Sequence, residues 1–419
     1  MMITSIVQKF LRDDARERFL RYVQIETTSN EHSGTHPSTQ TQWNLAKVVN
    51  AELEALQLQD VLLDEHCYVY ATLPASEGVV APPLTFCAHL DTSSSEPGGQ
   101  VKPLVHKHYD GGRITFPDNP DLLLSPENSS ELQKYLGQSI ITASGTTLLG
   151  ADDKAGIAEI LAALAALQQF KDFPHPELRV VFTPDEEIGE GTLYIQQEKL
   201  GRYGYTLDGG DMGELEDECF DALRAILTFH GVNVHPGNAK NRMVNAAAIA
   251  ARFVAMLPEH ETPEHTELRE GFYHLTRISG EENLAELRFI LRDFEPTTNL
   301  KRAEFLQHLI QVFELKYPGL RIELHLKEQY KNMRDVLEQS PEVTQKAEQA
   351  IEMAGIPLIK KAIRGGTDGA RLSFQGMPTP NIFTGGVLPH SKKEWIPEIA
   401  LQKAAEVILY LCYLWASAS

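Results

Sequence analysis

The sequence predicts an α/β domain built on a mostly parallel sheet, with a smaller α+β domain inserted into it. Between Ala71 and Asp208, apolar runs typical of buried strands alternate with helical patterns. Stretches that alternate apolar and polar residues follow, and then the first pattern returns. Residues 1–218 and 332–419 are therefore predicted to form one discontinuous domain, and residues 219–331 the insertion.

The elements of the first domain follow a strand–helix rhythm. Strands are predicted for PLTFCAHLD, ELRVVFTPDEE and GYTLDGG, and a helix for AGIAEILAALAALQQF. Functional residues of such sheets collect on loops that leave the C-terminal ends of strands. A segment rich in Pro, Gly, Asn and Asp, HKHYDGGRITFPDNPDLLLSPENSSEL, is predicted to be a long surface loop over the same edge.

The insertion shows a different texture. Half-exposed antiparallel strands are predicted for LRAILTFHGVNVH, ENLAELRFILRDF and GLRIELHLKEQY, and helices for NAAAIAARFVAML and KRAEFLQHLIQVFELKY. The α/β pattern returns with EVTQKAEQAIEMAG, RGGTDGARLSF and PNIFTGG. The apolar stretch VILYLCYLWA near the C-terminus is shorter than the ~20 residues that cross a bilayer, so we expect a core helix there.

The charge balance limits the partners of the chain. Its 419 residues include 38 Lys plus Arg and 58 Asp plus Glu, a net charge of −20 that opposes binding to nucleic acid or anionic membranes. The four cysteines lie far apart, which argues against a disulfide framework and a thiolate zinc site. The N-terminus lacks the apolar core of a signal peptide, so we expect a cytoplasmic protein.

The first predicted strand ends in the pattern His-x-Asp. His89 and Asp91 are two residues apart, so their side chains share one face of an extended chain. Asp91 could hold one imidazole nitrogen while the other nitrogen binds a metal. A surface His–Asp pair explains this pattern better when it stands alone, but acidic residues or His at four other predicted strand ends favour the metal.

Two other predicted strands end in carboxylates. TPDEEIGEG supplies Glu186 and Glu187, which point opposite ways in an extended chain, so one could bind metal and the other act as a general base. GYTLDGGD adds Asp208, followed by glycines that permit close backbone approach. Taken singly, these residues are explained better by an exposed acidic turn and by a cap or turn Asp.

Two further motifs complete the set. GADDKAG places Asp152 and Asp153 side by side ahead of a helix, and TGGVLPHSKKEW offers His390, which would be weak evidence alone. Two His and at least four carboxylates without thiolates suit zinc, with manganese or cobalt as substitutes. An Asp152 carboxylate between two dications could bridge them, which would turn repulsion between neighbouring carboxylates into attraction.

Many motifs along the chain together resemble the two-zinc exopeptidase family, in particular its aminotripeptidase branch, the peptidase T group. The motifs include HLDTS, GADDKAG, PDEEIG, YTLDGGDMGELE, VHPGNAK, EGFYHL, YKNMR and RGGTDGA, and the likeness covers nearly the whole chain. The resemblance implies two Zn²⁺ per chain and a cis peptide bond after the bridging Asp. It assigns the bridge to Asp152, one site to His89 and Asp208, the other to Glu187 and His390, the orientation of His89 to Asp91, and the general base to Glu186.

By the same resemblance, the insertion is a lid that recognises the substrate. It supplies His235, which would hold the scissile carbonyl of a short peptide with a free N-terminus. It also supplies Arg292, which together with Arg364 of the first domain would hold the C-terminal carboxylate of that peptide. The implied reaction is removal of the N-terminal residue from tripeptides by a hydroxide shared between the zinc ions. Structural salt bridges for the two arginines and a turn role for the His remain alternatives.

One motif departs from the family pattern. Pro389 restricts the turn before His390, and Ser391 stands where the family usually has Gly. Three kinds of hydrolase share the same metal ligands and stay open from the sequence: a dipeptidase, a carboxypeptidase and an N-acyl-amino-acid deacylase. A non-catalytic metal-binding protein is disfavoured because it would not need Glu186. An exposed edge of the lid sheet could pair two chains, so a homodimer through the lid and a monomer both stay open.

Overall fold

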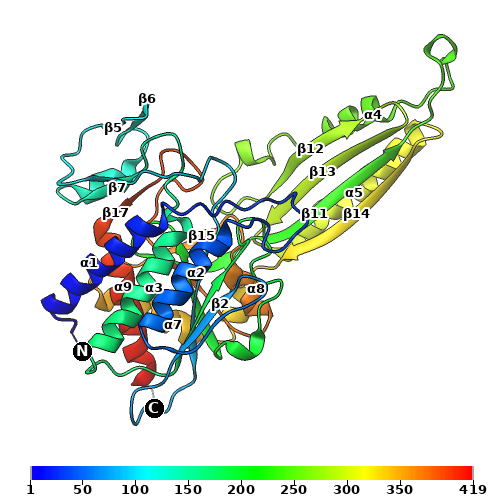
Figure 1. The fold of residues 1–419 in the computed structure, drawn as a ribbon. Coiled ribbons are helices and arrows are strands. Elements are labelled where there is room, and N and C mark those ends of the chain that lie inside the picture. The colour runs from blue at the N-terminus through cyan, green and yellow to red at the C-terminus, as the bar shows by residue number, and fades with distance from the viewer. Residues whose placement is uncertain (1, 418–419) are drawn as a thin grey trace. The chain divides into compact units, whose positions relative to one another are not determined.

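The computed structural model describes residues 2–417. The chain divides into two compact units (Figure 1). The first unit comprises the described residues up to Asp217, Asp335–Lys361 and the described residues from Thr367 onward. The second comprises Glu218–Arg334 and Ala362–Gly366, so the predicted insertion lies within it.

An eight-stranded sheet forms the centre of the first unit. Four neighbouring strands, β8, β3, β9 and β16, run parallel, and the pairs β1–β2, β2–β8 and β16–β10 are antiparallel. The predicted α/β class with a parallel sheet is confirmed, with antiparallel strands added toward the edges. In spatial order the strands are β1 (Gln59–Leu63), β2 (Val69–Leu73), β8 (Leu178–Thr183), β3 (Leu84–His89), β9 (Tyr203–Gly209), β16 (Asn381–Phe383), β10 (Glu214–Cys219) and β15 (Ile359–Ile363).

Both faces of this sheet are buried, since side chains alternate between the faces along each strand and each face packs in its own core. In β3, Leu84, Phe86 and Ala88 join the large core, whereas Cys87 joins a smaller core on the opposite face. Leu372 of the short helix α8 (Asp368–Phe374) packs in the smaller core. The large core lies beneath α1 (Ser5–Tyr22), α2 (Gln42–Ala55), α3 (Ala151–Gln169), α7 (Pro341–Met353) and α9 (Glu398–Ala416).

Helix α9 contains the apolar stretch that the sequence assigned to the core. It is the one helix among residues 2–417 whose length and composition would suit a membrane span, and 72% of that span is buried inside the protein. Leu401, Ala405 and Leu411 are fully buried in the large core. The prediction of a core helix is confirmed.

The segment that was predicted as a long loop contains regular secondary structure instead. It forms the hairpin β5 (Ile114–Phe116) and β6 (Asn119–Leu124), followed by a 3₁₀ helix, η1 (Ser130–Tyr135). Ile114, Phe116 and Leu124 turn inward and pack in a cluster with Trp395. The prediction was wrong because the turn-forming residues of the segment concealed this short apolar alternation. A three-stranded sheet lies beside the cluster and contains β17 (Trp395–Pro397), β7 (Ile140–Thr142) and β4 (Leu104–His106).

The second unit is an antiparallel four-stranded sheet with helices on one face. Ala225, Leu227 and Phe229 alternate inward along β11 and pack with Leu306 and Phe313 of α5. This confirms the predicted α+β character, although the sequence did not predict the strand β12. The elements are β11 (Asp221–His230), α4 (Ala246–Val254), β12 (Phe272–Gly280), β13 (Leu284–Asp293), α5 (Pro296–Lys316) and β14 (Arg321–Tyr330), and the strand order is β12-β13-β11-β14.

Candidate metal centre

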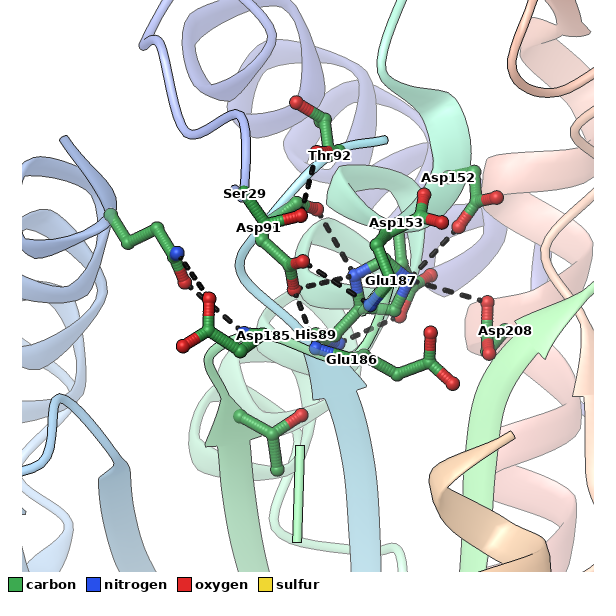
Figure 2. Close-up of polar contacts among 12 residues, drawn as sticks. Ser29, His89, Asp91, Thr92, Asp152, Asp153, Asp185, Glu186, Glu187 and Asp208 are labelled. Carbon is green, nitrogen blue, oxygen red and sulfur yellow. Dashed lines mark hydrogen bonds and ion pairs between the residues drawn. The ribbon is translucent and has the colours of Figure 1, made fainter. Parts of the chain in front are cut away.

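The C-terminal ends of the parallel strands bring the predicted residues together. His89 is the last residue of β3, Asp208 is the penultimate residue of β9, and Glu186 and Glu187 follow β8 by three and four residues. Because these strands are parallel neighbours, their ends meet at one edge of the sheet. Asp152 reaches the same place from the first turn of α3 (Figure 2).

His89 faces two carboxylates through its Nε2 atom. Nε2 lies 2.9 Å from Oδ1 of Asp152 and 3.5 Å from Oδ1 of Asp208 (Figure 2). On the opposite side of the ring, Nδ1 lies 3.0 Å from the backbone carbonyl of Asp91 and 3.4 Å from its carboxylate. A proton on Nδ1 would be held by Asp91, which leaves the Nε2 lone pair for a metal.

Asp91 has a second task that the sequence did not indicate. Its carboxylate accepts hydrogen bonds from the backbone N–H of Glu186 at 2.9 Å and of Glu187 at 3.2 Å. The contact with His89 Nδ1 comes mainly from the Asp91 carbonyl, rather than from the carboxylate as expected. Asp91 is fully buried. It therefore fixes the imidazole and the acidic turn relative to each other.

Asp152 stands between the two imidazoles. Its Oδ2 lies 3.1 Å from Nε2 of His390, while its Oδ1 faces His89. The same His390 nitrogen lies 2.9 Å from Oε1 of Glu187. Each imidazole thus contacts Asp152 and one further carboxylate, which is Asp208 for His89 and Glu187 for His390. The Asp152–Asp153 peptide bond is cis, as the resemblance implied.

The crowded carboxylates have perturbed acidities. Burial raises the pKa of Glu187 to about 7 and that of Asp208 to about 6, and the nearby charge of Asp152 adds to both shifts. Burial likewise raises the pKa of Glu186, and Asp208 adds to the shift. Hydrogen bonds to Asp152 and Glu187 raise the pKa of His390 to about 11. The raised pKa values of the carboxyl groups mean that their ionised forms are unfavourable here, and a nearby cation would stabilise those ionised forms.

The donor set fits a divalent metal ion. Nitrogen and oxygen atoms of His89, Asp152 and Glu187 lie within 4.8 Å of one another, and so do those of His89, Asp153 and Asp208. In addition, Oδ1 of Asp153 is buried and has no hydrogen-bond partner. Imidazoles and carboxylates without a thiolate are the ligands of borderline metals such as zinc. Asp153 was not a predicted ligand, and its Oδ2 accepts the backbone N–H of His89 at 2.9 Å.

Glu186 lies beside the cluster without joining it. Figure 2 shows its carboxylate without a drawn contact to the labelled side chains, whereas the Asp152 and Asp208 carboxylates both contact His89. Its backbone is held by Asp91. The alternative of an exposed acidic turn does not describe this residue, because its side chain is only partly exposed and adjoins buried acids.

The turn that carries His390 has an unusual backbone. Leu388 and His390 have φ values of 55° and 60°, in the left-handed region that non-glycine residues seldom adopt. Ser391, at the usual glycine position of the family, closes this turn with its side chain. Its Oγ donates to the carbonyl of Leu388 at 2.8 Å and accepts from the N–H of Lys393 at 3.2 Å. These bonds hold His390 toward Asp152 despite the departure from the family pattern.

Two residues that support the centre were missed by sequence reasoning. Glu394 is buried and accepts hydrogen bonds from the backbone around Asp152. Asp185 is also buried, has a φ of 58°, and accepts hydrogen bonds from the N–H and Oγ of Ser38 and from the side chain of Gln42. Only their proximity to His390 and Glu186 in the sequence could have drawn attention to them.

The three predicted substrate-binding residues all lie in the second unit. His235 is exposed, and its Nδ1 accepts the N–H of Gly237 at 3.1 Å, which leaves Nε2 as a donor. Arg292 is 8% exposed and donates to the carbonyl of Leu291 and to the side chain of Gln329. Burial lowers its pKa.

Arg364 was expected to come from the first domain, but the structure groups it with the second unit. Its Nη1 donates to the carbonyls of Leu268 and Glu270, and its Nη2 to the carbonyl and Oγ1 of Thr266. The guanidinium also lies over the ring of Phe220. These contacts tie the Arg364 side chain to residues 266–270, which explains why Arg364 is grouped with the second unit. They also occupy both terminal nitrogens, which would otherwise donate together to a carboxylate.

At the edge of this parallel sheet, two imidazoles, shared carboxylates and an adjacent acid lie together, an arrangement that fits a metal-dependent hydrolase. Comparison with known proteins makes this specific. The family model described as peptidase family M20/M25/M40 matches residues 149–413. The chain is 45% identical over 402 residues to peptidase T of Halothermothrix orenii, covering 96% of this chain and 98% of that one. It belongs to peptidase family M20/M25/M40, in the peptidase T branch.

Further relatives agree. Peptidase T of Desulfitobacterium hafniense strain Y51 is 46% identical over 401 residues, which are 96% of this chain and 98% of that protein. Among solved structures, aminopeptidase PepT from Bacillus cereus superposes with a TM-score of 0.74 at 22% identity, covering 96% of this chain and 98% of that one. A tripeptidase from Staphylococcus aureus gives a TM-score of 0.75 at 22% identity, covering 97% and 98%. The predicted family and the predicted enzyme class, a metallo-exopeptidase, are confirmed.

Proposed function

We propose that this chain is an aminotripeptidase that removes the N-terminal residue from short peptides at a two-zinc centre. The observation that carries the proposal is the position of Asp152, whose two carboxylate oxygens face His89 and His390 separately. Relatives named peptidase T match 96% of this chain, and a tripeptidase has the same fold. Both findings support the choice of substrate.

In this proposal the two metal sites share Asp152. His89 and Asp208 complete one site, and Glu187 and His390 complete the other, while Asp153 stays outside as an acceptor for the His89 backbone. Two Zn²⁺, when bound, would polarise the peptide carbonyl and lower the pKa of a water molecule. Manganese or cobalt could substitute, because the donors are nitrogen and oxygen.

Glu186 is proposed to move the proton. Its side chain takes no part in the closest contacts of the cluster, so it can accept a proton from the attacking water and deliver it to the departing amine. The raised pKa of this carboxyl suits a group that must both take up and release a proton. Asp91 serves this step indirectly, because it holds the Glu186 backbone.

The second unit is proposed to recognise the scissile carbonyl and the C-terminal carboxylate of the peptide. The free Nε2 of His235 could donate to the oxyanion, and Arg292 could pair with the C-terminal carboxylate. Arg364 is a weaker candidate for that carboxylate, because its terminal N–H groups already bind the backbone of residues 266–270. Its proposed role is to hold that segment in place.

The test is hydrolysis of trialanine by the zinc-loaded protein, beside dialanine, tetraalanine and N-acetyl-trialanine, with products identified by mass spectrometry. Release of alanine plus dialanine from free trialanine alone is the expected result. Preferential cleavage of the acetylated peptide would assign a deacylase instead, and trimming from the C-terminus at every length would assign a carboxypeptidase.

Two minor parts of the proposal concern assembly and location. A homodimer through the lid is proposed because β12 and β14 are the edge strands of the second unit's sheet and can each pair with another strand. A cytoplasmic location is proposed because the four cysteines lie far apart in the sequence, without the spacing of a disulfide framework. Sedimentation at several protein concentrations and cell fractionation test these two points.

A further inference from the structure

Glu394 holds the backbone that precedes and includes the bridging aspartate. Its Oε2 accepts hydrogen bonds from the N–H groups of Leu149 and Gly150, both at 2.8 Å, and its Oε1 accepts from the N–H of Asp152 at 3.1 Å. The side chain is buried, with only 1% of the residue exposed. One carboxylate therefore satisfies three backbone donors at the start of α3.

Glu394 is itself held in a rigid frame. Val387 and Trp395 close the intervening turn with two backbone hydrogen bonds of 2.9 and 3.0 Å. Trp395 is fully buried and donates from its indole nitrogen to Ser129. It also begins β17, which pairs with β7. The carboxylate thus approaches Asp152 from a fixed support.

The same closed turn carries His390. Residues 387–395 therefore reach Asp152 in two places, because His390 contacts its carboxylate and Glu394 contacts its backbone N–H. His89 contacts the other carboxylate oxygen. The position and the direction of the Asp152 side chain are fixed together by these three residues.

We propose that Glu394 is a positioning residue that aims the two carboxylate oxygens of Asp152 and thereby sets how tightly the centre holds its metal ions. This inference rests on the two-zinc function proposed above. A carboxylate is required because it offers acceptors to all three N–H groups, whereas the NH₂ of an amide side chain would oppose one of them.

The experiment compares Glu394→Gln with Glu398→Gln. Glu398 is also buried and lies close to Glu394 in the sequence. Its carboxylate pairs with Arg16 and makes no contact with residues 149–152. Zinc affinity is measured by competition with a chromophoric chelator, and folding by circular dichroism. We expect Glu394→Gln to bind zinc about 10–100-fold more weakly with native secondary structure. Its kcat should fall more than its KM changes, and Glu398→Gln should match the wild type.

Equal zinc affinity and kcat in the two variants would overturn the proposal. If Glu394→Gln does not fold, hydrogen exchange of the metal-free wild type decides the question. Slow exchange of the Leu149, Gly150 and Asp152 amides would support a cradle that exists before metal binds, and fast exchange would refute it. A wild-type protein that binds no zinc, or does not cleave peptides, would instead refute the function on which the inference rests.

Discussion

At the scale of single residues, hydrolysis should depend most sharply on Glu186. Replacing it with Gln keeps the shape of the side chain but removes its ability to take up a proton, so we expect kcat to fall by roughly 10²–10⁴-fold. Metal content, measured by atomic emission, should stay the same because Glu186 is not among the clustered ligand atoms. Glu190→Gln, an exposed change in the same turn, is the control. Turnover retained by Glu186→Gln would remove it as the base.

The two arginines of the second unit should respond differently to substitution. Arg292→Lys should raise KM for trialanine by about 10-fold, because a lysine cannot form two parallel hydrogen bonds to a carboxylate. Arg364→Lys should instead lower the stability by about 2 kcal/mol, because it loses hydrogen bonds to the carbonyls of residues 266–270.

Kinetics and thermal unfolding of both variants check this division. A higher KM in Arg364→Lys with unchanged stability would mean that its guanidinium leaves residues 266–270 to bind the peptide. An Arg292→Lys protein with normal KM would remove Arg292 from substrate recognition.

At the scale of elements, the strands that carry the centre could be predicted because their sequences repeat a simple physical pattern. The apolar runs that end in His89, in the turn of Glu187 and near Asp208 are buried on both faces, and parallel pairing brings their ends together. The kink at the start of α3 could not be read from its alanine-rich sequence. Asp152 and Asp153 have non-helical backbone angles there.

What the sequence could not provide were contacts between distant segments. Glu394 meets Gly150 across more than two hundred residues, and no local pattern distinguishes it from the neighbouring charged residues. Arg364 follows the same logic, since its partners at residues 266–270 are almost a hundred residues away. The resemblance supplied ligands, but it supplied none of these supporting contacts.

Strand β10 offers a prediction about pH. Glu216 is 6% exposed, and burial raises its pKa to about 8, with the nearby charge of Glu214 acting in the same direction. Its folded-state pKa exceeds the unfolded value of about 4.5, so the folded protein binds the proton more tightly. The stability from this group is complete below about pH 4.5 and is lost as the pH rises through about 8.

Glu216→Gln should remove this dependence, because the amide oxygen can still accept from the side chain of Asn381. We expect the variant to be more stable than the wild type at pH 9 by roughly 2–4 kcal/mol, since a tenfold change in proton affinity corresponds to about 1.4 kcal/mol. At pH 4.5 the two proteins should be similarly stable. Urea unfolding at both pH values measures this, with the exposed change Glu338→Gln as the control. A constant difference between variant and wild type would contradict the prediction.

At the scale of the whole molecule, the large core of the first unit and the core of the second unit support two different tasks. The large core joins the central sheet to its helices and lies in the first unit, whereas a separate core joins β11 and β13 to α4 and α5 in the second unit. The gathered carboxylates belong to the first unit only. Metal binding should therefore stabilise one core far more than the other.

Scanning calorimetry of the zinc-loaded protein, with and without EDTA, tests this separation. We expect two transitions, of which chelation lowers one, because the carboxylates around Asp152 repel each other once the cations are removed. Leu306→Ala opens a cavity in the second core. It should lower the free energy of unfolding of the second unit by roughly 2–5 kcal/mol, and with it the midpoint temperature of the other transition, and leave zinc affinity unchanged. If chelation shifted both transitions equally, or if only one transition appeared in every sample, the two cores would unfold as one cooperative body.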